Sequence, residues 1–151
     1  MPIGISALLL APAVRLFALV SLLLVLKMVL VGSYTSLLRL RRNVFATGED
    51  YAWRGARAPA APDEDIERVR RAHRNDLENI LPFFTVGLLY ALTNPSLRAA
   101  QTYFWGFLVA RVLHSIFYIR GMQPHRTIAF SLGLVLMLAM LASTLVTVAR
   151  A

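Results

Sequence analysis

Every acidic residue of this chain lies between Glu49 and Glu78, and long apolar stretches occupy the sequence on both sides of that window. Hydrophobic residues make up 58% of the chain and charged residues 16%, against roughly 45–50% and about 25% in soluble globular domains. A soluble domain carries charged side chains over its whole surface, so this distribution excludes one, and it also excludes a disordered chain. We therefore expect an integral membrane protein with one polar segment.

Four apolar stretches predict four transmembrane helices. The stretches lie at about 14–38, 77–92, 100–119 and 127–148. A helix needs about 20 apolar residues to cross the hydrocarbon core, and the second stretch is shorter than that. Pro62 followed by Asp63 is a helix start signal, and the acidic residues after it suit the positive end of the helix dipole. We expect a single all-α membrane domain over residues 1–151, with a second helix that extends into the cytoplasm.

The arginines are distributed unevenly over the connections between these stretches. The first connection, about residues 39–74, carries nine arginines, and the third carries Arg120 and Arg126. The opposite side offers Arg98, with one more arginine near each terminus. By the positive-inside rule, the first and third connections are cytoplasmic and both termini lie on the non-cytoplasmic side.

Two cationic side chains fall in the middle of predicted spans, Lys27 in the first and Arg111 in the third. An ionisable group at that depth costs about 2.5–3.5 kcal/mol, so each of them needs a polar partner. The only carboxylates within reach of Arg111 are Asp76 and Glu78, in the same chain or in a neighbouring one. Two roles are compatible with the sequence for Lys27 and Arg111: membership of a structural ion pair, or a part in a functional site.

Polar residues follow one face of two predicted helices into the membrane. On the third helix, Arg111, His114 and Tyr118 are spaced i, i+3, i+7, which places them on one face. On the second helix, a similar stripe ends at Asn75 and Glu78. No water solvates such stripes inside a bilayer, so both must face protein or a cavity, and four helices do not easily surround both. This pattern favours an oligomer with sites between its subunits.

The composition of the stripes indicates the class of ligand. Arginine-rich walls near the cytoplasmic interface suit a small anion that carries carboxylates or phosphates. Asn75 adds a hydrogen-bonding amide, and Glu78 adds an acceptor for an ammonium group. A ligand with two carboxylates, one amine and a reactive group would satisfy this set, and burial in the membrane gives access to an apolar second substrate.

Other chemistries are less well supported. The chain has no cysteine, and His73, His114 and His125 lack the spacing of zinc ligands, so no metal site is expected. The formal net charge of +8 is compatible with nucleic-acid binding. Because the arginines are interleaved with membrane spans, however, we expect no nucleic-acid partner.

The start of the second helix forms a long motif from Glu67 to Phe83, ERVRRAHRNDLENILPF. It closely resembles the signature of the MAPEG family, the membrane-associated proteins in eicosanoid and glutathione metabolism. The resemblance extends to residues 39–46 (RLRRNVFA) with Glu49 and Asp50, to residues 110–118 (ARVLHSIFY) and to residues 124–126 (PHR). It therefore covers nearly the whole chain.

The resemblance implies a homotrimer of four-helix subunits that binds glutathione at each subunit interface, near the cytoplasmic side. Glutathione carries two carboxylates, an amine and a thiol, and so belongs to the class of ligand that the residues indicate. The positions that match the family's motifs, and are thus the expected glutathione contacts, are Arg39, Arg71, Arg74, Asn75, Glu78, His114, Tyr118 and Arg126.

The resemblance also implies roles near the thiol. Arg126 is the candidate for stabilising the thiolate, Thr127 beside it can donate a hydrogen bond, and Asp50 is an accessory group. A nearby cation lowers the pKa of a thiol from about 8.5 and so raises the reactive thiolate fraction. The second substrate is expected to be apolar and to enter from the lipid.

Within the family, the motif shares features with glutathione transferases and with prostaglandin E synthases. Thr127 and Phe130 replace the serine and the tyrosine typical of the synthases, and the alanine- and arginine-rich composition suggests a bacterial chain. We expect a detoxifying transferase that conjugates the glutathione thiolate to hydrophobic electrophiles, with glutathione peroxidase activity on lipid hydroperoxides as an additional candidate. The alternatives are a prostaglandin E synthase-type isomerase and a non-catalytic lipid-binding scaffold. A bacterial inner membrane is favoured over the endoplasmic reticulum.

Overall fold

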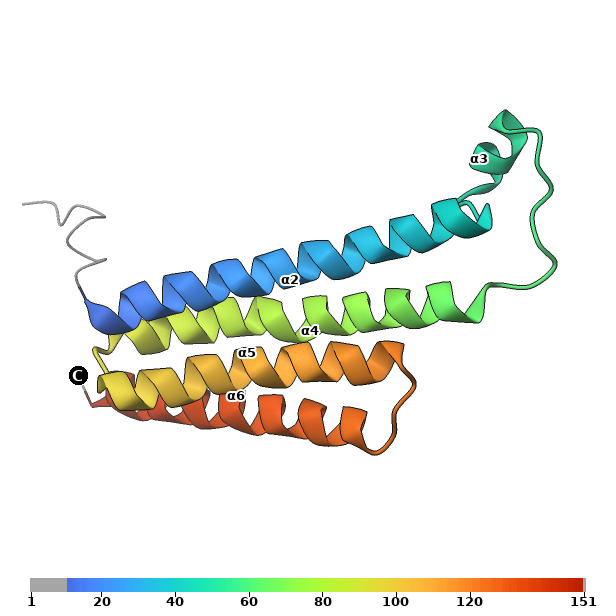
Figure 1. The fold of residues 1–151 in the computed structure, drawn as a ribbon. Helices are drawn as coiled ribbons and strands as arrows, with labels where there is room; N and C mark the ends of the chain where they lie inside the picture. Colours follow the sequence, from blue (N-terminus) through green and yellow to red (C-terminus); the bar gives the residue numbers. More distant parts are fainter. Residues whose placement is uncertain (1–10, 151) are drawn as a thin grey trace, which may run out of the picture.

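The computed structural model describes residues 11–150, which form four long helices and a short one (Figure 1). The helices are α2 (Pro12–Arg42), α3 (Gly48–Trp53), α4 (Glu64–Leu92), α5 (Leu97–Ile119) and α6 (His125–Ala149). No β-strand occurs in these residues, so the all-α prediction is confirmed for them. The remaining ends of the predicted domain, residues 1–10 and 151, lie outside this range.

Short polar side chains cap the starts of α4 and α5. Asp63 precedes α4, and its Oδ1 accepts hydrogen bonds from the backbone N–H groups of Asp65 (3.0 Å) and Ile66 (3.1 Å). Ser96 precedes α5 in the same way and accepts from the N–H of Ala99 at 3.4 Å. These caps satisfy N–H groups that have no partner within the first helical turn. The predicted start signal at Asp63 is therefore confirmed, and α4 begins well ahead of its apolar part.

Arg42, at the end of α2, contacts the start of α4 across the connection that contains α3. Its Nη1 lies 2.7 Å from both carboxylate oxygens of Asp63, and its Nη2 lies 2.7 Å from Oδ2 of Asp65. The hydrogen bond from Arg42, followed by those from the α4 backbone, holds the pKa of the Asp63 carboxyl below its usual value. Because these groups are exposed, the contact adds little to the free energy of unfolding. Its effect is to hold the end of α2 against the start of α4.

The long helices run antiparallel along the chain, with α4 and α5 in the middle of the bundle and α2 and α6 at its opposite edges (Figure 1). The start of α2, the α4–α5 turn and the end of α6 lie at one end of the bundle. The short helix α3 and the α5–α6 turn lie at the other end. The chain thus has the alternating order that the predicted topology requires.

Three of the helices, α2, α5 and α6, are long and apolar enough to cross a membrane by length and composition. Large apolar side chains also face outward, such as Leu22 on α2 (69% exposed) and Val135 on α6 (62% exposed). An exposed apolar surface of this kind fits contact with lipid or with another protein. The helix α4 is not among the three because its first half, up to Glu78, is charged, so its crossing stays a prediction.

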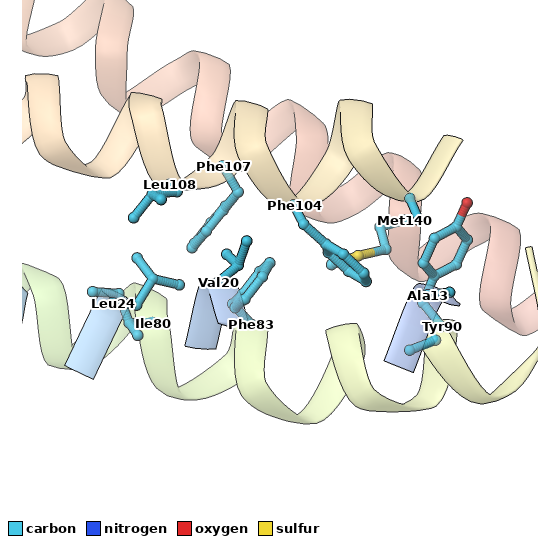
Figure 2. Close-up of a cluster of buried hydrophobic side chains, with 12 residues drawn as sticks. Ala13, Val20, Leu24, Ile80, Phe83, Tyr90, Phe104, Phe107, Leu108 and Met140 are labelled. Carbon is cyan, nitrogen blue, oxygen red and sulfur yellow. The ribbon is translucent and has the colours of Figure 1, made fainter. Parts of the chain in front are cut away.

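Aromatic side chains from α4 and α5 form the centre of the core, and aliphatic side chains of α2, such as Val20 and Leu24, pack with them (Figure 2). The rings of Phe83 and Phe107 stack with centroids 4.3 Å apart, and Phe104 meets Phe83 edge-on at 5.9 Å. Phe17 of α2 lies 5.7 Å from Phe104. Such geometries add about 0.5–1.5 kcal/mol per pair beyond the burial of apolar area. The cluster holds the membrane-depth part of the three helices together.

Gly87 lets α4 approach the Phe17 ring closely, since a Cβ atom there would lie 2.8 Å from Phe17 Cε2. We expect Gly87→Leu to destabilise the protein by about 1–3 kcal/mol because the packed aromatic core has no room for the added atoms. Thermal unfolding in detergent, followed by circular dichroism, should show a lower midpoint. The control is Ala139→Leu, which adds a leucine at an exposed position of α6. Equal midpoints for the two variants would contradict the close approach at Gly87.

Candidate functional site

A fully buried carboxylate, Asp76 of α4, joins three helices. Its Oδ1 accepts a hydrogen bond from Arg111 Nη2 of α5 at 2.8 Å, and its Oδ2 pairs with Lys27 of α2. Ser115 of α5 donates to Oδ2 at 3.2 Å. Arg111 is 1% exposed. Both mid-span cations, Lys27 and Arg111, thus pair with the same buried carboxylate within their own chain. Of the carboxylates considered from the sequence, Asp76 is the partner, and Arg111 has a structural ion pair.

Arg111 connects this buried ion pair to one of the predicted glutathione contacts. Its Nη2 also lies 2.7 Å from Oδ1 of Asn75, on the same turn of α4 as Asp76. A guanidinium group only donates hydrogen bonds, so the Asn75 oxygen faces Arg111. The amide nitrogen of Asn75 is then left as the group that can donate to a ligand.

Three further predicted contacts form a cluster between α5 and α6. The ring centroids of His114 and Tyr118 are 5.5 Å apart, and the Arg126 guanidinium lies over the Tyr118 ring at 4.5 Å from its centroid. His114 is 3% exposed, and neither of its ring nitrogens has a hydrogen-bond partner among residues 11–150. Buried polar atoms are almost always paired, so this imidazole is ready to bind a polar group. The face predicted from the i, i+3, i+7 spacing is present: Arg111 and His114 are buried, and Tyr118 is half-buried.

The predicted arginines of α2 and α4 lie in a different place. Arg39, Arg71 and Arg74 line a cavity of about 600 Å³ between the ends of these two helices. Arg39 Nε and His73 Nδ1 are buried there without a hydrogen-bond partner in the described range. This cavity is rich in positive charge and suits an anion.

The remaining predicted residues are not brought together within one chain. Glu78 is exposed on α4, and Thr127 is exposed on α6 with its Oγ1 3.0 Å from the amide of Gln123. Asp50 caps the short helix α3, where it accepts from the N–H of Thr47 at 3.2 Å. Because α3 lies beside α2 and the start of α6 lies at the opposite edge of the bundle, Asp50 does not reach Arg126 in one subunit (Figure 1).

Two polar residues of this region were not singled out from the sequence. Ser115 adds a hydroxyl to the Asp76 network, and its position four residues after Arg111, on a predicted span, was the available signal. Gln123 precedes a proline in the α5–α6 turn, and nothing in its sequence context marks a contact with Arg126 or Thr127. Across residues 11–150, no group of three or more histidine and acidic side chains is arranged to hold a metal ion.

The sequence profile of the MAPEG family matches residues 17–146. The chain belongs to the MAPEG family. The resemblance drawn from the motif at residues 67–83 is therefore confirmed.

Its relatives carry two different names. Microsomal glutathione S-transferase 1 of Sus scrofa is 44% identical over 122 residues, which cover 78% of this chain and 79% of the relative. The protein of the same name from Rattus norvegicus is 46% identical over 112 residues, covering 71% and 72%. Prostaglandin E synthase of Homo sapiens is 40% identical over 124 residues, covering 82% of each chain. Relatives of both kinds thus match most of this MAPEG chain.

The Asp76 network gives a graded prediction for stability. Asp76→Asn removes the carboxylate that both Lys27 and Arg111 contact, so we expect a loss of about 3–5 kcal/mol or failure to assemble. Arg111→Leu should be milder, because Lys27 still pairs with Asp76, and it should lower the folded yield more than any ligand affinity. Thermal midpoints and size-exclusion yields in detergent measure both effects.

The control for these two variants is Asp65→Asn, which removes exposed ion pairs with Arg42 and Arg68 and should cost less than about 1 kcal/mol. A normal yield for Arg111→Leu together with weakened ligand binding would overturn the structural role of Arg111. An Asp76→Asn protein as stable as the control would overturn the role of Asp76.

Proposed function

We propose that this protein is a membrane-bound, glutathione-dependent transferase that conjugates glutathione to hydrophobic electrophiles. The observation that carries the proposal is the cluster of His114, Tyr118 and Arg126. In it, a buried imidazole with no hydrogen-bond partner among residues 11–150 lies next to the Tyr118 ring, and the Arg126 guanidinium lies over that same ring. The names of the relatives at 44% and 46% identity support glutathione as the ligand. A pure lipid scaffold has no need for such a set of polar groups at the cytoplasmic end of its membrane helices.

The chemistry assigned to these residues is the activation of a thiol. Arg126 stabilises the thiolate of glutathione, the thiol proton leaves to water, and Thr127 donates a hydrogen bond to the sulfur. The sulfur then forms a bond to the electrophilic carbon of the second substrate, whose leaving group departs with its electron pair. A positive charge lowers the pKa of the thiol from about 8.5, so more thiolate is present near neutral pH. The acceptor reaches the sulfur from the lipid.

The glutathione contacts divide into two groups in one chain, which supports a site shared between subunits. The α5–α6 cluster around Arg126 and the α2–α4 cavity around Arg39 lie toward opposite edges of the bundle. A second copy placed with its α2 edge against the first copy's α6 edge would bring the two groups together. We propose a homotrimer, in which a closed cyclic arrangement repeats this interface. Asp50 would then act on the thiol of the neighbouring subunit.

We also propose a membrane topology for the chain. The helix α4 forms the fourth crossing with residues 77–92, and its charged first half extends into the cytoplasm. Both termini lie on the non-cytoplasmic side of a bacterial inner membrane. The arginines of the α2–α4 connection support this orientation, because positive residues are retained on the cytoplasmic side.

A prostaglandin E synthase-type isomerase is the second candidate, favoured by the relative of that name that covers 82% of this chain. Peroxidase activity on lipid hydroperoxides is a third activity that the same thiolate would support. All three activities need the thiolate, so they share one test of the site.

Arg126→Ala should lower the turnover of glutathione conjugation to a generic aryl halide by about 100-fold or more, because the stabilising charge on the thiolate is lost. The assay uses the purified oligomer in detergent, and size exclusion should show an intact assembly. Arg120→Ala is the control, since it removes an exposed arginine from the same turn. Unchanged turnover in Arg126→Ala would remove Arg126 from the mechanism.

The first assay also separates the candidate functions. Glutathione binding without conjugation would direct attention to hydroperoxide reduction and prostaglandin isomerisation, measured with their own substrates. Absence of glutathione binding would overturn the enzyme proposal and leave the scaffold.

Co-expression of two inactive chains tests the shared site. We expect the Arg39→Ala and Arg126→Ala proteins each to have low activity alone. Each mixed trimer should regain one interface of three with both arginines intact, which is roughly a quarter of all interfaces after random co-assembly. The measurement compares co-expressed chains with the same two proteins purified separately and then combined. Mixed oligomers with no more activity than the separate proteins would contradict a site between subunits.

A further inference from the structure

Gln123 lies in the turn between α5 and α6, exposed and next to the start of α6. Its side-chain amide stands between the two groups assigned to thiolate stabilisation. One end of the amide is 3.0 Å from Thr127 Oγ1, and the other end faces the Arg126 guanidinium, 3.1 Å from Nε and 2.5 Å from Nη2.

Hydrogen-bond chemistry fixes the orientation of the amide. The guanidinium of Arg126 only donates, so the amide end that faces it must be the oxygen. Gln123 Oε1 then accepts from Nε and Nη2 of Arg126, and Gln123 Nε2 donates to Thr127 Oγ1. The reverse orientation would place the amide N–H groups against the guanidinium N–H groups and leave both sets unpaired.

This orientation has consequences for both neighbours. Arg126 is held between the Gln123 oxygen and the face of the Tyr118 ring, which leaves its Nη1 N–H groups for a ligand. A hydroxyl has one proton to donate and two lone pairs to accept with. Because Thr127 accepts from Gln123, its own proton remains available for another acceptor. In the reverse orientation, the Thr127 hydroxyl would donate its hydrogen bond to the Gln123 oxygen and would have no proton left for another acceptor.

We propose that Gln123 is a positioning residue, which through one amide orients the Arg126 guanidinium and keeps the Thr127 proton free for a bound thiolate. The inference rests on the proposed glutathione chemistry. Gln123 itself does not touch the sulfur. It acts through Arg126 and Thr127, and its exposure means that its replacement leaves the packed core unchanged.

The test is the pKa of the thiol of bound glutathione, read from the ultraviolet absorbance of the thiolate in the purified oligomer as the pH is varied. Gln123→Met keeps the length of the side chain and removes both hydrogen bonds. We expect it to raise the thiol pKa by about one unit, a tenfold smaller thiolate fraction below that pKa. The turnover number should fall in parallel, while KM for glutathione stays within about twofold.

A second variant separates positioning from packing. Gln123→Glu still holds Arg126 but cannot donate to Thr127, and it adds a negative charge near the sulfur, so its thiol pKa should rise at least as far as that of Gln123→Met. Met122→Leu, an adjacent exposed position, should leave the pKa unchanged. A Gln123→Met pKa equal to that of the unmodified protein overturns the inference alone. An unmodified protein without any thiolate absorbance overturns the proposed function, and the inference with it.

Discussion

The rest of the structure depends on the pairing of Asp76 with Lys27 and Arg111. Three helices each place an ionisable group at the same level of the bundle, and within residues 11–150 this is the buried charged contact that joins all three of α2, α4 and α5. A lone charge in a hydrocarbon environment is costly, whereas a paired and hydrogen-bonded one is tolerated. The ion pairs therefore fix the register of α4 against both neighbours. The aromatic core around Phe83 then packs in that register.

The same network connects stability to the candidate site. The Nη2 group of Arg111 donates hydrogen bonds both to Asp76, which is buried, and to Asn75, which belongs to the polar stripe of α4. The orientation of the Asn75 amide is therefore set from inside the bundle. One turn further along α5, His114 faces α6 with both nitrogens unpaired among the described residues. The candidate site residues Asn75 and His114 therefore lie next to the buried ion pair of Asp76 and Arg111, on the same or adjacent turns of α4 and α5.

The antiparallel order of the chain divides the polar groups between two edges of the bundle. Arg39 lies near the end of α2, and Arg126 lies at the start of α6. The helices α4 and α5 lie between α2 and α6. Both groups nevertheless lie at the same end, where α3 and the α5–α6 turn are found. An interface between copies is the simple way in which groups at the same end but on opposite edges of the bundle can bind one ligand. Gln123 orders the α6 half of such a site without contributing to the core.

The sequence by itself determined the helical class, the start of α4 at its Asp63 cap and the polar stripes, because periodicity, capping residues and hydropathy act over a few neighbouring residues. The motif at residues 67–83 likewise identified the family. Only the tertiary structure decided that Asp76, rather than Glu78, pairs with the buried cations, and that Ser115 joins them. It also decided that Gln123 lies between Arg126 and Thr127. Such choices depend on distances between side chains of different helices and turns, which no local pattern in the sequence specifies.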